Sequence, residues 1–344
     1  MEKRYHYLNI LKTLGMFAVL TLHVFATPYT YWSENYDAFH RFLAFFIKNI
    51  LISWAVPIFV MVSGALFLNP KKEINYKQVF KKYVLRLILV LFTFGLLFAL
   101  MENVFNTKII SMNTLFKSFV DVIKGETWSH LWFIYMIIGL YICTPPLKSI
   151  FAKIERNEML VFLMILFVFL SLLPFFNEIL GFKTGFYIPF SGIYIFYFLL
   201  GTMLHEEKIV IPTWLCFVFI GINILYVVLG QFFPDNTVVS GARIKYLDNN
   251  SPLSVLISTG IFVLLKNCIQ QKENLFDTFF APLSFGVYVV HPLFINFFLK
   301  FIKFNPQNYP ICVVNAVLLS VTLMGSVGMV FVLRKIPFIK KYIL

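Results

Sequence analysis

Cysteine is scarce in this sequence, and the positions of the few cysteines exclude two kinds of site. The chain of 344 residues has four, Cys143, Cys216, Cys268 and Cys312, and no two of them stand at the short spacing of a metal-binding or redox pair. They fall within or at the ends of separate hydrophobic segments. We therefore expect buried free thiols, with neither a disulfide framework nor a metal site.

Charged residues are scarce as well, and this excludes a soluble protein. Only 13% of the residues are charged, whereas 60% are hydrophobic and 43 are Phe. A soluble domain cannot bury so much apolar surface. The longest hydrophilic stretches have about 20 residues, and no repeat or linker divides the chain. We therefore expect a single membrane-embedded domain over residues 1–344.

Long apolar segments make up most of the chain. A transmembrane helix needs about 20 predominantly apolar residues, and helices satisfy their own backbone hydrogen bonds in lipid. The sequence therefore predicts an all-α polytopic membrane protein with ten transmembrane helices. The predicted spans are 8–27, 47–68, 84–104, 130–150, 158–176, 186–204, 214–233, 252–269, 282–302 and 310–333.

The distribution of basic residues predicts the orientation of these spans. With a cytoplasmic N-terminus, 18 Lys and Arg residues lie in the inner segments and 10 in the outer ones. This bias predicts that both termini are cytoplasmic in a multi-pass protein of the cell membrane. The net charge of +13 then matches the anionic lipids of the inner leaflet. The lipid bilayer is the expected partner of these charges, and no nucleic acid is expected.

Two ionisable residues stand inside the first predicted span. Lys12 and His23 are eleven residues apart, close to three helical turns, so they lie on nearly the same face, about 16 Å apart along the axis. Ionisable groups within a membrane usually face the protein interior and serve a function. Lys12 could instead extend to the headgroups, and His23 could bond a neighbouring helix. Because the two share one face, we favour an internal channel that both residues line.

Basic and small residues gather at the predicted inner end of the bundle. Arg86 lies at the inner end of the third span, beside the segment KKYVLR, and Ser63 lies in the inner half of the second span. With Lys12 they could bind a phosphorylated anion from the cytoplasm, because a guanidinium holds phosphate with two parallel hydrogen bonds. The alternative is that the loop cations only anchor the chain to the inner leaflet.

Two imidazoles and a carboxylate are predicted at one depth near the outer side. His23 would be level with Glu102 of the third span and His130 of the fourth. Such groups could form a general base and its orienting partner. Trp132, close to His130, could stack on a sugar ring, although an aromatic belt at the interface is the usual role of Trp at this depth.

A further histidine lies near the middle of the ninth predicted span. His291 follows Tyr288 by one helical turn and precedes Pro292 directly. His291 and Tyr288 are therefore additional candidate site residues. The alternative for His291 is a hydrogen bond to a backbone carbonyl that Pro292 leaves without a donor.

Several of these segments resemble one family of integral-membrane enzymes. YLNILKTLGMFAVLTLHVF is similar to the opening helix of acyltransferase family 3, whose signature is Arg, ten residues, then His. Three further stretches match the family in order and spacing: VPIFVMVSGALFL, WSHLWFIYMIIGLYICTPPL, and YIFYFLLGTML with SFGVYVVHPL. The resemblance covers nearly the whole chain. Lys12 stands at the position of the family's arginine. It keeps the positive charge, but a lysine cannot bind an anion bidentately as an arginine does.

The resemblance implies transfer of an acyl group, commonly acetyl and sometimes succinyl, from cytoplasmic acyl-CoA to a hydroxyl of a cell-surface polysaccharide or glycolipid. Acyl-CoA would be a co-substrate, and no cofactor would stay bound. Lys12 and Arg86, with Ser63 nearby, would bind the donor phosphates. His23 would act as general base or as a transient acyl carrier, and His130 or Glu102 would orient it or the acceptor. A homodimer or a complex with glycan-synthesis machinery is left open.

The main alternative is a transporter or flippase for polysaccharide or lipid-linked sugar. Ten helices with few buried charges and proline-interrupted spans fit such a protein too. A receptor is less favoured because the sequence has no appended soluble module. Use of acyl-CoA is the property that separates the enzyme from the transporter.

Overall fold

The described part of the chain is helical throughout, as the sequence predicts. The computed structural model describes residues 5–32, 38–180, 184–188, 192–230, 248–269 and 274–344, and these ranges contain no strand. Helices are the expected result, because a segment in lipid has no water to satisfy its backbone N–H and C=O groups.

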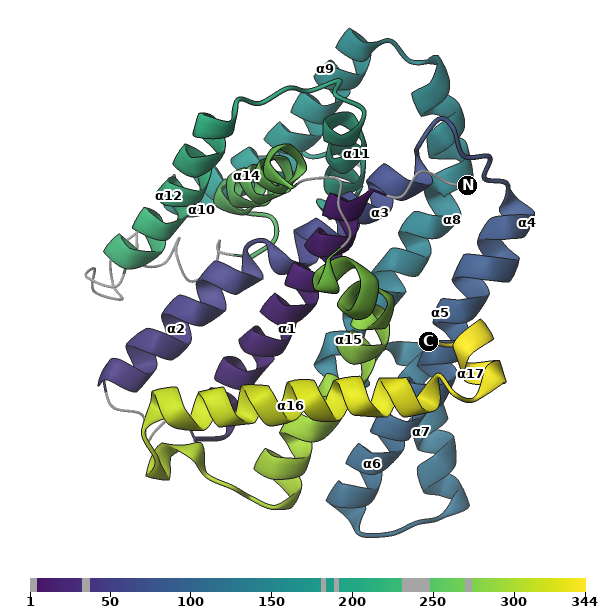
Figure 1. Cartoon of the computed structure of the whole chain (residues 1–344), viewed down its shortest axis with the longest axis vertical. Helices are drawn as coiled ribbons and strands as arrows, with labels where there is room; N and C mark the ends of the chain where they lie inside the picture. The colour runs from purple at the N-terminus through teal and green to yellow at the C-terminus, as the bar shows by residue number, and fades with distance from the viewer. Residues whose placement is uncertain (1–4, 33–37, 181–183, 189–191, 231–247, 270–273) are drawn as a thin grey trace.

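Figure 1 labels most of the α-helices. Their bounds are α1 His6–Trp32, α2 Ala38–Ile52, α3 Ala55–Phe67, α4 Tyr76–Gln78, α5 Leu85–Val90, α6 Leu96–Thr107, α7 Met112–Lys124, α8 Trp132–Lys153, α9 Arg156–Phe167, α10 Leu173–Leu180, α11 Tyr194–His205, α12 Thr213–Gly230, α14 Pro252–Cys268, α15 Ala281–Asn296, α16 Ile311–Leu333 and α17 Pro337–Tyr342. Two elements are short 3-10 turns, η4 Ser129–Leu131 and η8 Pro306–Asn308. Five π-helical turns continue their neighbouring helices: η2 Val79–Val84, η3 Leu91–Gly95, η5 Val168–Leu172, η6 Phe276–Phe280 and η7 Phe297–Phe301.

The helices confirm an all-α polytopic membrane protein. Seven described segments are long and apolar enough to cross a membrane: His6–Pro28, Phe42–Phe67, Tyr76–Thr107, Ser129–Lys153, Arg156–Glu178, Phe276–Phe301 and Ile311–Leu333. The three remaining predicted spans correspond to shorter apolar helices, Tyr194–His205, Thr213–Leu229 and Pro252–Cys268. Ten apolar helices are therefore present in the described ranges, but the prediction that all ten are of full spanning length is not met.

The second predicted span, 47–68, is broken into α2 and α3. Pro57 has no N–H to donate to the carbonyl of Ser53, where an unbroken helix would place a hydrogen bond. That carbonyl instead accepts the hydroxyl of Ser258 in α14, at 3.2 Å. The proline thus ends one helix, and the freed carbonyl connects the break to a neighbouring helix.

The sixth predicted span, 186–204, also differs from the structure. Residues 186–188 are not helical, residues 189–191 lie outside the described residues, and α11 begins only at Tyr194. Gly192 has a φ of +82°, a left-handed conformation that an α-helix cannot contain. The end of another predicted span, 231–233, lies outside the described residues.

The cysteines are free, as predicted, but most of them are not buried. Cys216 is buried, whereas Cys143, Cys268 and Cys312 are exposed on the protein surface. The sequence pattern shows that a residue lies in an apolar helix, but it does not show which face of that helix contacts lipid and which contacts protein.

Helix α1 lies in the middle of the bundle and contacts α2, α3, α15 and α16 (Figure 1). Helices α3 and α11 pack closely at two glycines. A methyl group added at Gly64 would lie 1.8 Å from the carbonyl oxygen of Phe198, and one at Gly201 would lie 2.2 Å from that of Met61. Glycine is required at both positions because the two backbones touch there.

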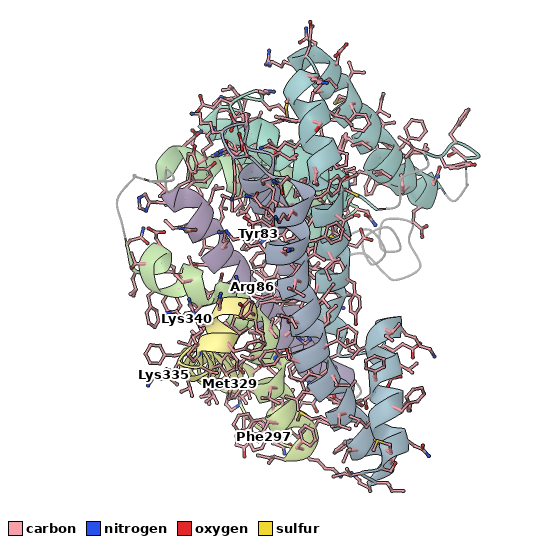
Figure 2. The ribbon with its side chains drawn as sticks, turned by 90° about the vertical axis from the view of Figure 1, so that its right-hand side faces the viewer. Tyr83, Arg86, Phe297, Met329, Lys335 and Lys340 are labelled. Atoms are coloured by element: carbon pink, nitrogen blue, oxygen red, sulfur yellow. The ribbon has the colours of Figure 1, made fainter. Side chains whose placement is uncertain are left out.

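The C-terminal helix α17 packs against α5, the helix that carries Arg86 (Figure 2). The carbonyl of Ile343, next to the last residue, accepts a hydrogen bond from Arg86 Nε at 3.1 Å. Arg86 in turn lines the same cavity as Lys12 of α1. The even number of membrane crossings and the cytoplasmic placement of both termini stay predictions.

Candidate active site

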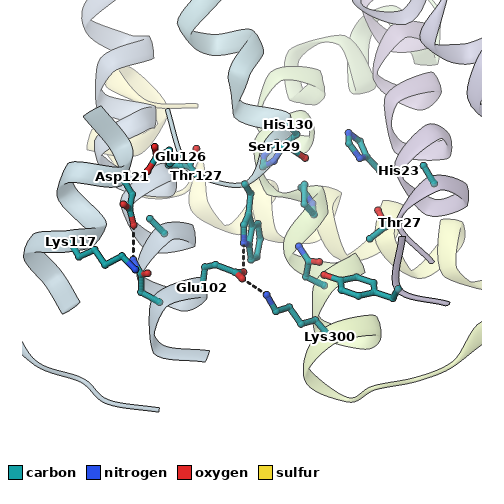
Figure 3. A pocket seen from close by; sticks show the side chains of 17 residues that line it. His23, Thr27, Glu102, Lys117, Asp121, Glu126, Thr127, Ser129, His130 and Lys300 are labelled. Carbon is teal, nitrogen blue, oxygen red and sulfur yellow. Dashed lines mark hydrogen bonds and ion pairs between the residues drawn. The ribbon is translucent and has the colours of Figure 1, made fainter. Parts of the chain in front are cut away.

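A cavity of about 650 Å³ contains three of the predicted site residues. His23 of α1, Glu102 of α6 and His130 of η4 all line it, although they are far apart in the sequence. We call it the histidine cavity; the other residues that line it are Ala26, Thr27, Tyr31, Ala99, Asn103, Lys117, Asp121, Glu126, Thr127, Trp128, Ser129, Pro292, Asn296 and Lys300. Figure 3 shows His23 and His130 along one edge of this cavity.

Three imidazole rings gather at that edge. The ring centroid of His23 lies 6.5 Å from that of His130 and 5.1 Å from that of His291. The rings of His130 and His291 are 5.5 Å apart, and both side chains are buried. Because α1, η4 and α15 each supply one ring, the packing of these three elements positions the cluster.

A charged pair lies across the histidine cavity from the imidazoles. Glu102 forms an ion pair with Lys300 of η7 and accepts a hydrogen bond from the indole N–H of Trp128 at 3.2 Å (Figure 3). Nearby, the amide of Asn103 donates to Asp121 at 2.8 Å. The cavity therefore offers hydrogen-bond donors, acceptors and an aromatic edge, which is the mixture of groups that binds a polyhydroxylated ligand.

A second cavity, of about 370 Å³, contains the three predicted donor-binding residues. Lys12 of α1, Ser63 of α3 and Arg86 of α5 line it, as does Tyr288 of α15. We call it the lysine cavity; its other lining residues are Phe59, Val62, Leu66, Phe67, Tyr83, Leu87, Phe133, Ile137, Tyr141, Ala281, Pro282, Ser284 and Phe285. Two cations thus face one small, largely aromatic space.

The polar groups of the lysine cavity have defined neighbours. The guanidinium of Arg86 lies over the ring of Phe285, 5.7 Å from its centroid. The hydroxyls of Ser63 and Tyr141 are 3.4 Å apart. Figure 2 shows Tyr83 and Arg86 one above the other along the same helical segment, with α17 beside Arg86.

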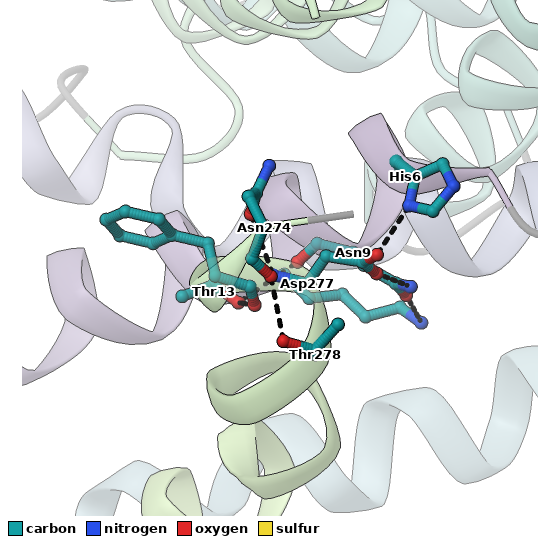
Figure 4. A network of polar contacts seen from close by, with 8 residues as sticks. His6, Asn9, Thr13, Asn274, Asp277 and Thr278 are labelled. Atoms are coloured by element: carbon teal, nitrogen blue, oxygen red, sulfur yellow. Dashed lines mark hydrogen bonds and ion pairs between the residues drawn. The ribbon is translucent and has the colours of Figure 1, made fainter. Parts of the chain in front are cut away.

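A buried carboxylate connects Lys12 to the end of α15. Asp277 of η6 is fully buried, is bonded to His6 and accepts the amide of Asn9 at 2.5 Å (Figure 4). Asn9 in turn accepts the ammonium of Lys12 at 3.4 Å. The hydroxyl of Thr13 donates to the carbonyl of Phe276 at 2.9 Å. These contacts hold the first turns of α1 against η6, and Lys12 extends from this network to line the lysine cavity.

Two cavities take the place of the single channel that the sequence predicts. Lys12 lines the lysine cavity and His23 lines the histidine cavity, and no described residue lines both. Tyr288 lies between them: it lines the lysine cavity, its hydroxyl donates to the carbonyl of His130, and its ring centroid lies 5.8 Å from that of His130. The rings of Phe133 and Phe59 lie 5.7 and 6.4 Å from that of Tyr288.

The family model for an acyltransferase domain matches residues 5–332, which is nearly the whole chain and includes both cavities. The chain belongs to acyltransferase family 3. No curated protein and no solved structure shows a significant match to it. Membership supports acyl transfer in general.

Two predicted site residues of this acyltransferase lie apart from the cavities. The side chain of Trp132 is 42% exposed, and its ring contacts that of Tyr194 at 5.6 Å rather than lining either cavity. His291 is fully buried behind the histidine cavity, where its ring contacts His23. The alternative hydrogen bond that the sequence allowed for His291 is present, since Nδ1 lies 2.7 Å from the carbonyl of Tyr288.

The sequence reasoning did not find Lys300 and Asp277. Lys300 was counted only among the outer basic residues, whereas the acyltransferase uses it as the partner of Glu102. Asp277 precedes the predicted span 282–302, but the helical segment already begins at Phe276. The sequence did contain a signal for Asp277, because it is the one acidic residue in the apolar stretch FDTFF. A carboxylate inside an apolar helix requires a partner, so the sequence indicates that another group contacts it.

The described residues contain no group of His, Cys, Asp and Glu side chains arranged to hold a metal ion. The three imidazole rings are separated by more than 5 Å between centroids, and His130 and His291 each hydrogen-bond a backbone carbonyl.

Replacement of Asp277 by alanine is expected to destabilise the acyltransferase by about 3–5 kcal/mol, because it leaves His6 and Asn9 without their buried partner. Thermal unfolding of the purified protein in detergent measures the loss. The matched control is Thr278→Ala, since the neighbouring Thr278 is exposed and its hydroxyl donates to the carbonyl of Asn274 within the same turn. Equal unfolding temperatures for the two variants would contradict a tethering role for Asp277.

Proposed function

We propose that this acyltransferase moves an acyl group, acetyl or succinyl, from cytoplasmic acyl-CoA to a hydroxyl of a cell-surface polysaccharide or glycolipid. The observation that carries the proposal is the sorting of the polar residues into two cavities. The lysine cavity collects two cations and a hydroxyl, and the histidine cavity collects imidazoles, amides and charged groups. Both cavities lie along α1, divided by Tyr288 and its aromatic neighbours.

The lysine cavity suits the donor. Coenzyme A combines a phosphate-rich end with a long, thin arm that ends in a thioester. Lys12 and Arg86 offer charge-assisted hydrogen bonds to phosphate, and the aromatic walls of the cavity suit the arm. A coenzyme A arm that extends to Tyr288 brings the thioester close to His130, with only the side chain of Tyr288 between them. In the predicted orientation this cavity faces the cytoplasm, where acyl-CoA is found.

The histidine cavity suits the acceptor. Its volume of about 650 Å³ accommodates a sugar unit, and the Glu102–Lys300 pair and Asn103 offer hydrogen bonds to hydroxyl groups. The indole of Trp128, stacked on Phe98 at 4.4 Å between ring centroids, provides a rigid aromatic edge.

His23 is the general base in the proposed reaction. The imidazole accepts the proton of the acceptor hydroxyl while the hydroxyl oxygen attacks the thioester carbonyl carbon. The carbon–sulfur bond then breaks, the new ester forms, and the coenzyme A thiolate takes the proton from His23. The products are the acylated glycan and free coenzyme A, and His23 returns to its neutral form.

The test uses the purified protein in detergent with acetyl-CoA. We expect acetyl-CoA to bind the wild-type protein, and we expect Lys12→Ala to weaken binding by about 10–100-fold, since a hydrogen bond to a charged group contributes about 1.5–3 kcal/mol. Lys12→Arg should retain binding because it keeps the charge. The control is Lys335→Ala, which removes an exposed cation that lines neither cavity.

The acceptor is tested in cells that lack the protein. Mass spectrometry of their surface glycans should show the loss of one ester, which identifies the acyl group and the acceptor together. Absence of acetyl-CoA and succinyl-CoA binding, with glycan esters intact in the deletion strain, would contradict the proposal and favour a transporter.

A further inference from the structure

Among the described residues, His291 is the one member of the imidazole cluster that has a fully buried ring nitrogen without a hydrogen-bond partner. Its side chain has no exposed surface, and its Nε2 atom has no hydrogen-bond partner in the described ranges. A buried polar atom without a partner costs about 1–3 kcal/mol, so its presence requires an explanation.

The backbone fixes which nitrogen of His291 carries the proton. Pro292 has no N–H, so the helix around it has lost one of its backbone donors. The carbonyl of Tyr288, four residues before Pro292, therefore has no N–H donor at position 292 and accepts Nδ1 of His291 at 2.7 Å. A carbonyl only accepts, so the proton of the neutral ring is on Nδ1 and the lone pair is on Nε2.

The same reasoning applies to His130. Its Nε2 atom lies 3.1 Å from the carbonyl of Val289, so this nitrogen carries the proton and Nδ1 carries the lone pair. His130 and His291 are thus both held by carbonyls of α15 as neutral rings with defined tautomers. His23 has neither constraint in the described structure, and its ring forms a triangle with the other two, at centroid distances of 6.5 Å from His130 and 5.1 Å from His291.

The distance between His23 and His291 is that of a hydrogen-bonded pair of imidazoles. Two rings joined by an N–H···N bond of about 2.9 Å have their centres about 5 Å apart. The rings of His23 and His291 meet this distance, with centroids 5.1 Å apart. His130 lies farther from His23 and on the side of the cavity itself.

We propose that His291 is a positioning residue, whose Nε2 lone pair accepts an N–H of His23 and stabilises the imidazolium that forms when His23 takes the acceptor proton. This inference rests on the proposed function. In a catalytic triad, a carboxylate accepts an N–H of the base histidine in the same way. Here a neutral ring, whose tautomer is set by Pro292, takes that place. No proton is transferred to His291: the proton that His23 gains is passed on to the departing thiolate.

The test compares His291→Phe, which keeps a ring of similar size without nitrogens, with His291→Gln, whose amide oxygen can accept an N–H. We expect His291→Phe to lower kcat for acyl transfer about a hundredfold with little change in the KM for acyl-CoA, and His291→Gln to restore kcat to within about tenfold of wild type. Thermal unfolding in detergent reports whether either variant has lost its fold.

A second variant acts on the tautomer without removing the ring. Pro292→Ala supplies an N–H that competes for the Tyr288 carbonyl, so His291 is no longer held with its proton on Nδ1. We expect kcat to fall several-fold, with acetyl-CoA binding unchanged.

The outcomes separate this inference from the proposed function. Wild-type kcat in His291→Phe, or equal losses in His291→Phe and His291→Gln, would overturn the positioning role while leaving acyl transfer in place. A wild-type protein that binds no acyl-CoA and releases no coenzyme A would overturn the proposed function, and the inference with it.

Discussion

His23→Ala is expected to reduce acyl transfer by about 10²–10⁴-fold, the contribution of a general base. His23 is the only described residue of the imidazole cluster whose ring both lines the histidine cavity and is free of a backbone hydrogen bond. Its removal should therefore abolish proton transfer and leave donor binding at the lysine cavity intact. Release of free coenzyme A in the presence of the acceptor measures the effect, and acetyl-CoA binding is measured on the same sample.

The matched control for this variant is Thr21→Ala on the same helix. Thr21 precedes His23 by two residues, donates to the carbonyl of Phe17 at 2.9 Å and lines neither cavity. It should retain wild-type transfer. A His23→Ala protein that folds, binds acetyl-CoA and transfers acyl groups at the wild-type rate would remove His23 from the mechanism.

Gly201→Ala is expected to destabilise the fold strongly. The added methyl group would lie 2.2 Å from the carbonyl oxygen of Met61, so α3 and α11 would have to move apart. Overpacking of this kind costs about 3 kcal/mol or more, because backbone atoms cannot rotate aside as side chains do. We expect the unfolding temperature in detergent to fall by about 5–10 °C. Because α3 carries Ser63 into the lysine cavity, acetyl-CoA binding should weaken as well.

Gly139→Ala provides the control for this prediction. Gly139 is also in the middle of a helix, but no atom lies within 4 Å of a methyl group added there in the described structure. Alanine favours a helix over glycine by about 1 kcal/mol, so Gly139→Ala should leave the unfolding temperature unchanged or raise it. If both variants unfolded at the same temperature, the close contact of α3 and α11 would not be a determinant of stability.

Much of the fold could be predicted from the sequence because the bilayer imposes a simple rule. Each apolar run of sufficient length forms a helix, and each predicted span has a helical counterpart in the structure. The break between α2 and α3 was harder to predict from the sequence. Pro57 alone does not end a membrane helix, and the break is completed by the hydroxyl of Ser258, from a distant segment.

The site was predictable to the extent that it depends on helical periodicity. The spacing of Lys12 and His23 predicts that both face the interior, and each of them lines a cavity. The division into two cavities was not predictable, because it depends on the packing of Tyr288 from α15 between them. The pairing of Lys300 with Glu102 likewise depends on contacts between helices that lie nearly 200 residues apart in the chain.

The layer of rings formed by Tyr288, Phe133 and Phe59 also bears on electrical insulation. A membrane protein with water-filled cavities at two depths would dissipate ion gradients if a continuous path of water joined those cavities. Closely packed aromatic side chains admit no file of water molecules, and an ion without its hydration shell meets a steep energetic barrier in such a medium. The rings that separate the two cavities therefore also prevent ions from leaking across the membrane between them.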